Sequence, residues 1–127
     1  MTKLGERVVT SADGLKLTAA EWGAPQGLPV FSLHGTPGSR LGRDPDEVLY
    51  DRLDMHLVTY DRPGYGGSDR QRGRRVVDAV ADVVSIADAL GFDRIGVAAG
   101  YLAIAGAWED HVLWQRISPA MEPPSPQ

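Results

Sequence analysis

Apolar and polar positions alternate along segment 15–22, which is the pattern of a half-buried strand. Segment 6–10, with Val8 and Val9 at its centre, predicts another strand, and a turn that contains Asp13 and Gly14 separates the two. Because an Asp-Gly pair readily adopts the positive φ angles of a tight turn, the pattern predicts an antiparallel hairpin. Two short apolar runs follow, at 29–34 and 55–60, and each predicts a buried strand.

Helical spacing appears between and after these two buried strands. Segment 44–53 predicts a first helix, with acidic residues in the first turn, where the helix dipole favours them. The strongest helix is predicted over 74–90, with Gly91 at its C-terminal cap. One face of it holds the apolar residues Val76, Val77, Val80, Val83, Val84, Ala87 and Leu90, and the other face is marked by Asp78, Asp82 and Ser85. With a further strand at 95–98, this order is typical of an α/β protein with a mostly parallel sheet.

The pattern changes after Ala99. Apolar residues keep helical spacing over 101–112, which predicts one amphipathic helix there, and the end at 118–127 is rich in proline. The chain is therefore expected to divide into a main part, 1–99, and a divergent tail, 100–127, with a helix followed by a disordered end.

Composition narrows the class of protein. The 127 residues suit one modest domain, and an apolar fraction of 43% with 24% charged residues is that of an ordinary globular protein. The net charge of −4 argues against nucleic acid or an anionic membrane as partner. The absence of cysteine excludes disulfides and thiolate sites, and the remaining histidines and carboxylates show no metal-ligand spacing, so neither metal nor cofactor is expected. Without an apolar leader or membrane-length segment, the expected location is the cytoplasm.

Two glycine-rich loops follow the two buried strands. Segment 34–39 reads HGTPGS, and segment 61–68 reads DRPGYGGS. Glycine lets the backbone pass close to a ligand and direct N–H groups at it. Either loop alone could be a simple strand-end turn, but the carboxyl ends of parallel strands are where open α/β sheets bind ligands. Two such loops on consecutive parallel strands therefore indicate a ligand site.

The order of motifs resembles a known family. "VFSLHGTPGSR", "LVTYDRPGYGGSD", an amphipathic helix and "ALGFDRIGVA" resemble the N-terminal part of α/β-hydrolase fold proteins, in the group of small esterases, epoxide hydrolases and proline-iminopeptidase-like enzymes. The resemblance covers roughly residues 4–99. It implies an antiparallel hairpin, parallel strands and flanking helices. It also implies hydrolysis of an ester or related bond, in a small-molecule substrate, by a serine nucleophile.

The resemblance assigns roles to particular positions. The oxyanion loop would comprise His34, Gly35, Thr36, Pro37 and Gly38, with the backbone N–H of Thr36 as a donor. The pocket loop would include Asp61, Arg62, Gly64 and Tyr65. Segment 95–98 would lead into the nucleophile elbow, whose pattern is G-x-S-x-G.

The chain departs from the family at this elbow. Tyr101 stands where the serine belongs, and a shift by one residue places Leu102 there. Asp110 and His111 are adjacent on the predicted helix, where neighbours point in different directions and do not form an acid–histidine pair. The expectation is therefore a hydrolase fold truncated after its fifth strand, without a triad and inactive by itself. The alternative is a non-catalytic module that binds a ligand or a protein.

The remaining candidates are expected to be structural. His56 begins a strand, at the end away from the loops, and Ser39 and Ser68 have no identifiable general base. The arginine-rich run 70–75 is expected to be a solvated loop and the start of a helix, rather than a nucleic-acid site. A fifth strand without its neighbour would expose a sheet edge, so self-association through that edge is expected. Two origins of the tail stay open, a frameshift or a genuine short form.

Overall fold

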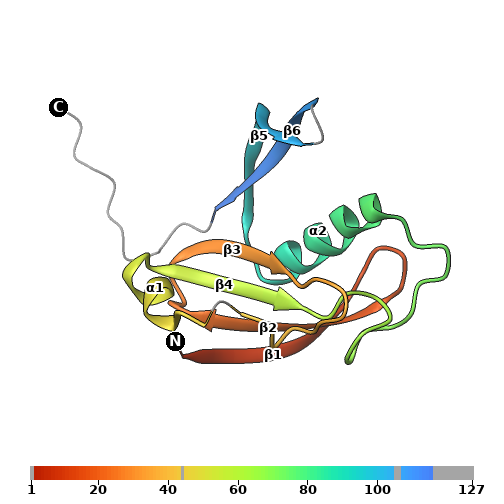
Figure 1. Ribbon diagram of the computed structural model, residues 1–127, viewed down its shortest axis with the longest axis horizontal. Helices are drawn as coiled ribbons and strands as arrows, with labels where there is room; N and C mark the ends of the chain where they lie inside the picture. The colour runs from red at the N-terminus through yellow and green to blue at the C-terminus, as the bar shows by residue number, and fades with distance from the viewer. Residues whose placement is uncertain (1, 44, 105–106, 116–127) are drawn as a thin grey trace.

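Four strands form a mixed sheet in the order β1-β2-β4-β3 in the computed structural model, which describes residues 2–43, 45–104 and 107–115 (Figure 1). They are β1 (Lys3–Thr10), β2 (Lys16–Gly23), β3 (Leu28–Leu33) and β4 (Met55–Tyr60). β2 pairs antiparallel with both β1 and β4, whereas β3 and β4 are parallel. The predicted hairpin and both predicted strands are confirmed, but only β4 is buried, whereas β3 is partly exposed. The sheet is mixed rather than mostly parallel.

The turn between β1 and β2 forms as its sequence predicts. Gly14 has a φ of +81°, in the left-handed region that glycine enters without steric cost. Its N–H donates to the carbonyl of Ser11 over 2.9 Å, and the Ser11 N–H donates to the carbonyl of Leu15 over 2.8 Å. The Ser11 hydroxyl oxygen also accepts from the Leu15 N–H at 3.1 Å, so local bonds fix the register of the hairpin.

Helix α1 (Glu47–Arg52) connects β3 to β4 and lies within the predicted segment 44–53. Its buried residue is Tyr50, which packs on one face of the sheet in a cluster with Ala20, Trp22 and Leu57. The guanidinium of Arg43, just before the helix, lies 3.8 Å from the centroid of the Trp22 ring and covers this cluster.

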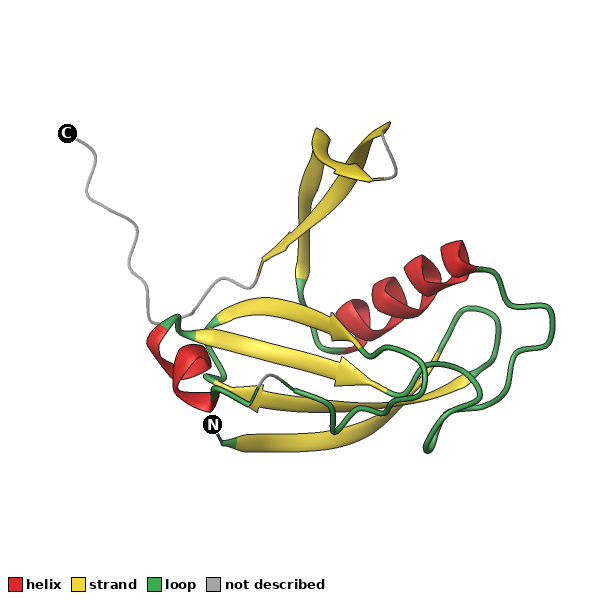
Figure 2. Ribbon diagram, in the orientation of Figure 1, coloured by secondary structure: helices red, strands yellow, loops and turns green. Residues whose placement is uncertain are grey.

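Helix α2 (Ala79–Ala89), preceded by the 3₁₀ turn η1 (Val76–Asp78), packs on the other face of the sheet. Figure 2 shows α2 along the upper side of the sheet and α1 at its left end. The main core lies beneath α2 and comprises Val9, Leu17, Ala19, Val58, Tyr60, Ile86, Ala87, Leu90 and Phe92. Gly91 follows the helix with a φ of +71°, as expected for its cap.

The predicted faces of this helix are partly wrong. Val76, Val77 and Val80 are 88%, 60% and 59% exposed, whereas Asp82, predicted on the polar face, is only 2% exposed. The Asp82 carboxylate accepts from the Tyr60 hydroxyl at 3.1 Å and from Arg74 Nη2 at 2.5 Å. Because these partners offset the cost of burying its charge, the helix turns Asp82 inward and leaves the valines outside.

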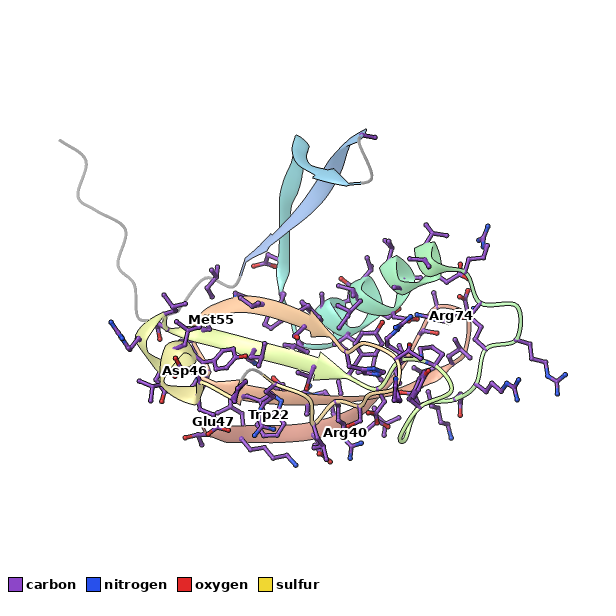
Figure 3. All side chains as sticks on the ribbon, viewed as in Figure 1. Trp22, Arg40, Asp46, Glu47, Met55 and Arg74 are labelled. Atoms are coloured by element: carbon purple, nitrogen blue, oxygen red, sulfur yellow. The ribbon has the colours of Figure 1, made fainter. Side chains whose placement is uncertain are left out.

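Side chains alternate between the two faces along the central strands. Leu57 packs in the cluster on α1, and the next residue, Val58, packs in the core beneath α2. Trp22 belongs to the first of these clusters, whereas Arg74 binds Asp82 of α2, and both residues are labelled in Figure 3. Strands β2 and β4 are thus buried on both faces, although each of them also carries polar residues.

The end of the described chain differs most from the sequence predictions. The helix predicted over 101–112 is wrong, because β5 (Asp93–Ile104) and β6 (Ala107–Gln115) form a separate two-stranded antiparallel sheet (Figure 1). Its residues are rich in β-branched and aromatic types, which favour strands, and Gly100 disfavours a helix.

The predicted strand 95–98 therefore lies within β5 but pairs with β6, with Val97 opposite Val112. It does not extend the main sheet, so within the described residues the outer strand beyond β4 is β3. The open edge expected on the fifth strand thus belongs to β3. The division proposed after residue 99 falls inside β5, and the proline-rich segment 118–127 lies outside the described residues.

Candidate functional site

Two loops begin side by side at the carboxyl end of the parallel strand pair. β3 ends at Leu33 and β4 at Tyr60, and these two residues are register partners. The loop at residues 34–38, called the oxyanion loop after its predicted role, and the glycine loop (residues 61–68) start directly after them. The parallel pairing of β3 and β4 is therefore what brings together the two motifs that lie more than twenty residues apart in the sequence.

His34 joins the two loops. Its Nε2 accepts the backbone N–H of Arg62 at 3.0 Å, and its ring packs edge-on against Tyr65 with the centroids 5.2 Å apart. Because Nε2 is an acceptor, the proton lies on Nδ1, which donates to the Gly35 carbonyl over 2.7 Å. Both ring nitrogens are thus engaged in a neutral imidazole, and His34 has no free nitrogen for proton transfer.

The oxyanion loop presents backbone donors without a described acceptor, among them the N–H of Thr36. Within the described part of the chain, the backbone N–H of Thr36 donates to no acceptor, and the residue is exposed. The Thr36–Pro37 peptide bond is cis. At Gly38, a Cβ atom would lie 2.6 Å from His34 Nδ1 and 2.7 Å from the Gly35 carbonyl oxygen, so only glycine fits there without moving the loop.

Asp61 anchors both loops from below. Its carboxylate is fully buried and accepts from the Arg40 backbone N–H at 2.7 Å, Arg40 Nη1 at 2.7 Å and the Gly67 N–H at 2.9 Å. A Cβ on Gly66 would collide with this carboxylate, which accounts for the glycine. Because both carboxylate oxygens are engaged, Asp61 holds the loops in place and is not positioned as a general base.

Arg40 also binds a second carboxylate, that of Glu6, at the surface. Its Nε donates to Glu6 Oε1 over 3.1 Å, and this bond, with that of Asp61, raises the pKa of the guanidinium further above its ordinary value. The pKa of Glu6 is lowered in turn, first by its hydrogen bond to Lys3 and then by that to Arg40. A chain of charged groups therefore runs from the surface of β1 to the base of the loops.

The two serines at this edge have structural bonds. The Ser68 hydroxyl donates to the Asp61 carbonyl over 2.6 Å and accepts the Thr18 N–H at 2.9 Å. The Ser39 hydroxyl accepts the Leu41 N–H at 3.2 Å. Among the described contacts, neither hydroxyl donates to a histidine or a carboxylate, which an activated serine requires.

A pocket of about 180 Å³ lies between the two loops and the start of η1. Its lining residues come from three segments and are Thr36, Arg62, Pro63, Tyr65, Arg74, Arg75 and Val76. Thr36 of the oxyanion loop therefore lines the same space as three arginines. Sequence reasoning placed Thr36, Arg62 and Tyr65 here, and it missed the contribution of the segment before α2.

The arginine-rich run 70–75 is not simply a solvated loop. Arg74 is only 13% exposed and binds the buried carboxylate of Asp82, as well as Gln71 Oε1 at 2.8 Å. Beneath it, burial and then the Asp82 charge raise the pKa of Tyr60 well above its ordinary value, so this hydroxyl keeps its proton and donates to Asp82. An aspartate inside the apolar repeat was the one sequence signal that could have revealed this pair.

The position expected for the nucleophile is not part of this site. Tyr101 lies inside β5, as does Leu102, and no strand-to-helix elbow forms there. Asp110 and His111 lie in β6, in a strand rather than the predicted helix. His56 lies at the start of β4, where Nε2 is 3.0 Å from Glu21 Oε1 and Nδ1 is 3.2 Å from the Pro25 carbonyl oxygen.

The described residues offer neither a metal-binding cluster nor a helix that could span a membrane. The described residues contain no group of three or more histidines, cysteines or carboxylates arranged to hold a metal ion. Over the same part of the chain, no helix has the length and apolar character needed to cross a membrane.

Comparison with known proteins identifies the fold. No family model matches the chain. It is 32% identical over 83 residues to a non-heme chloroperoxidase from Streptomyces lividans, covering 65% of this chain and 30% of that protein. An esterase from Rhodococcus sp. ECU1013 matches with a TM-score of 0.56 and 28% identity, over 69% of this chain and 33% of that one.

An α/β hydrolase from Sphaerobacter thermophilus DSM 20745 matches with a TM-score of 0.52 and 32% identity, over 67% of this chain and 32% of that one. The chain thus spans about a third of the length of these relatives, at 30%, 33% and 32%. Together with the strand order and the two loops, these matches show that the chain carries the N-terminal part of an α/β-hydrolase fold.

Proposed function

We propose that this chain supplies the oxyanion-loop side of an ester-hydrolase site. The observation that supports this most is the unengaged N–H of Thr36, a residue that lines the pocket, while the histidine, aspartate and serines around it are all committed to structural bonds. A backbone N–H at this place would stabilise the negative charge that develops on an ester carbonyl oxygen.

The proposal assigns binding, and not turnover, to the described residues. Donors that stabilise an oxyanion accelerate hydrolysis strongly only when a nucleophile and its base act beside them. In the described part of the chain, no serine or histidine at this edge is free for that role. Ester hydrolysis by a serine nucleophile, which the family resemblance implies, therefore requires groups beyond those described here.

A direct test combines a rate assay with a binding assay on the full chain. We expect p-nitrophenyl acetate to be hydrolysed no faster than in buffer alone. We expect phenyl acetate, titrated into ¹⁵N-labelled protein, to shift the amide signals of Thr36 and Tyr65. Hydrolysis that Ser39→Ala or Ser68→Ala abolishes would show a nucleophile in this chain, and unshifted loop signals would argue against the oxyanion site.

A second candidate function is the binding of another polypeptide. β3 is the outer strand of the described sheet and its sequence, LPVFSL, has no charged residue to discourage edge pairing. Val76, Val77 and Val80 form an exposed apolar strip on η1 and α2. Light scattering across a concentration series tests this: association that Val77→Ser plus Val80→Ser abolishes supports it, and a monomer at all concentrations argues against self-association.

A further inference from the structure

The pocket beside the oxyanion loop is positively charged in an acidic protein. Three of its lining residues are Arg62, Arg74 and Arg75, whereas the chain as a whole has a net charge of −4. No carboxylate lines the pocket. This contrast indicates a local preference for anions that the composition of the chain conceals.

Two of the three positive charges are balanced within the protein. Arg74 binds the buried carboxylate of Asp82. Arg75 binds Asp78 Oδ1 over 3.2 Å, and this aspartate has a lowered pKa because it also accepts the Arg75 backbone N–H. The carboxylates of these two pairs therefore cancel two charges, and one arginine remains.

Arg62 is the unbalanced cation. It is half-buried and forms no ion pair with any carboxylate in the described ranges of the chain. Its side chain has one polar contact there, from Nη1 to the His34 carbonyl at 3.3 Å. This contact holds the guanidinium at the pocket wall and leaves its other N–H groups available, which is the arrangement that receives a carboxylate.

The charge balance favours a monoanion over a dianion. A single uncompensated guanidinium matches one carboxylate, whereas a phosphate monoester carries about −1.5 to −2 at neutral pH and would bring an unmatched charge into the pocket. Pro63 and Val76 add apolar walls, and about 180 Å³ accommodates a short carbon chain between the arginine and Thr36.

We propose that this pocket selects substrates that carry a free carboxylate a short distance from the ester group, and that Arg62 recognises this carboxylate. The ester part of the statement rests on the proposed function, whereas the recognition of a carboxylate by Arg62 does not. A half-ester of a short dicarboxylic acid has the required chemistry, with its acid on Arg62 and its ester carbonyl near the Thr36 N–H.

The test compares monomethyl succinate with dimethyl succinate, which has a similar shape but no charge. Each compound is titrated into the ¹⁵N-labelled full chain at low salt. We expect monomethyl succinate to bind at least about tenfold more tightly, because the charged compound gains a charge-assisted hydrogen bond. We expect its affinity to fall several-fold when the ionic strength is raised from about 0.02 to 0.2 M, a measurement that needs no variant.

Variants assign the effect to one side chain. Arg62→Gln removes the charge but leaves the backbone N–H that bonds His34, so we expect the fold to persist and the tenfold preference to disappear. Arg62→Lys keeps the charge without the planar fork and should retain part of the preference. Arg72→Gln, an exposed arginine outside the pocket lining, is the matched control and should bind like the parent chain.

The outcomes separate this inference from the proposed function. Equal binding of the two succinate esters, or tighter binding of inorganic phosphate, would overturn the carboxylate assignment and leave the oxyanion site intact. Preference for monomethyl succinate that depends on Arg62, without any shift of the Thr36 amide, would support the inference and contradict the oxyanion site. A preference that survives Arg62→Gln in a folded protein would show that another residue binds the carboxylate.

Discussion

The two ends of the parallel strand pair each hold a histidine with both ring nitrogens engaged, but in opposite ways. His34, after β3, accepts a backbone N–H at Nε2 and is neutral. His56, at the start of β4, faces only acceptors: the Pro25 carbonyl and the Glu21 carboxylate. Nδ1 of His56 must therefore donate to the carbonyl, while Nε2 and Glu21 share a second proton.

This difference separates the proposed binding edge, at the His34 end, from a structural edge at the His56 end. At the His34 end, the histidine uses its bonding capacity to shape a loop and leaves a backbone donor free beside a pocket. At the His56 end, a buried histidine–carboxyl pair closes the sheet, with His56 1% exposed and Glu21 8% exposed. Residue type alone does not distinguish the two ends, because each combines a histidine with an acidic residue and an arginine.

The largest expected effect comes from removing the carboxylate under the loops. Asp61→Ala leaves three donors without their acceptor, among them the Arg40 guanidinium, so we expect a loss of about 3 kcal/mol in the free energy of unfolding. Urea denaturation measures this. Asp88→Ala, an exposed position on α2, is the control and should change stability by less than about 0.5 kcal/mol. Equal effects would mean that Asp61 is not an anchor.

At the structural edge, removing the Glu21 side chain should lower the free energy of unfolding. Glu21→Ala leaves buried His56 without its partner at Nε2, and we expect a loss of about 2 kcal/mol. Arg7→Ala removes the other partner of the same carboxylate, from a side chain that is 47% exposed, and should cost less than about 1 kcal/mol. Denaturant titrations of both variants test the comparison, which fails if the exposed pair proves the stronger one.

The binding edge should lose function before stability. In Gly38→Ala, the new Cβ would press on His34 and the Gly35 carbonyl, so we expect the loop to move and phenyl acetate binding to weaken at least about tenfold. Gly35→Ala is the matched control, because a Cβ at Gly35 meets nothing within 4 Å. The amide shifts of Thr36 report both variants, and equal binding by the two would exclude a tight packing role for Gly38.

The smallest expected effect is a decrease in folding stability as the pH falls. The pKa of Glu6 is lowered, first by Lys3, from an ordinary value of 4.5, and that of Asp78 is lowered, first by the Arg75 backbone N–H, from 3.8. Their stabilisation is therefore complete above these ordinary values and is lost as the pH falls through the lower folded-state values. Urea midpoints between pH 6 and about pH 3 should fall less steeply in a Glu6→Gln, Asp78→Asn variant than in the parent chain.

The elements that could be predicted are those whose signal is local. The alternation at 15–22 and the run at 55–60 describe strands before any contact is known, and Gly14 and Gly91 mark conformations that glycine favours. The loops at 34–38 and 61–68 follow those strands directly, so their place at one edge followed from the parallel pairing. The position of the two loops at one edge of the sheet could therefore be predicted from the sequence.

The elements that could not be predicted depend on partners far away in the sequence. Apolar spacing placed Asp82 on the solvent side, but Tyr60 and Arg74 compensate its charge and bring it into the core. Helical spacing over 101–112 was equally compatible with strands, and pairing with the preceding segment produced β5 and β6. Neither the burial of Asp82 nor the pairing of β5 with β6 can be predicted from a short stretch of sequence.

The sequence by itself thus determined the α/β order, the two loops and the absence of a serine where β5 replaces the expected elbow. Only the tertiary structure decided which charges remain unbalanced. Arg74 and Arg75 meet carboxylates, and Arg62 meets a carbonyl and a pocket. The physical reason is that local patterns follow from backbone conformation and burial, whereas the charge of a site is a sum over groups that only folding brings within a few ångströms of one another.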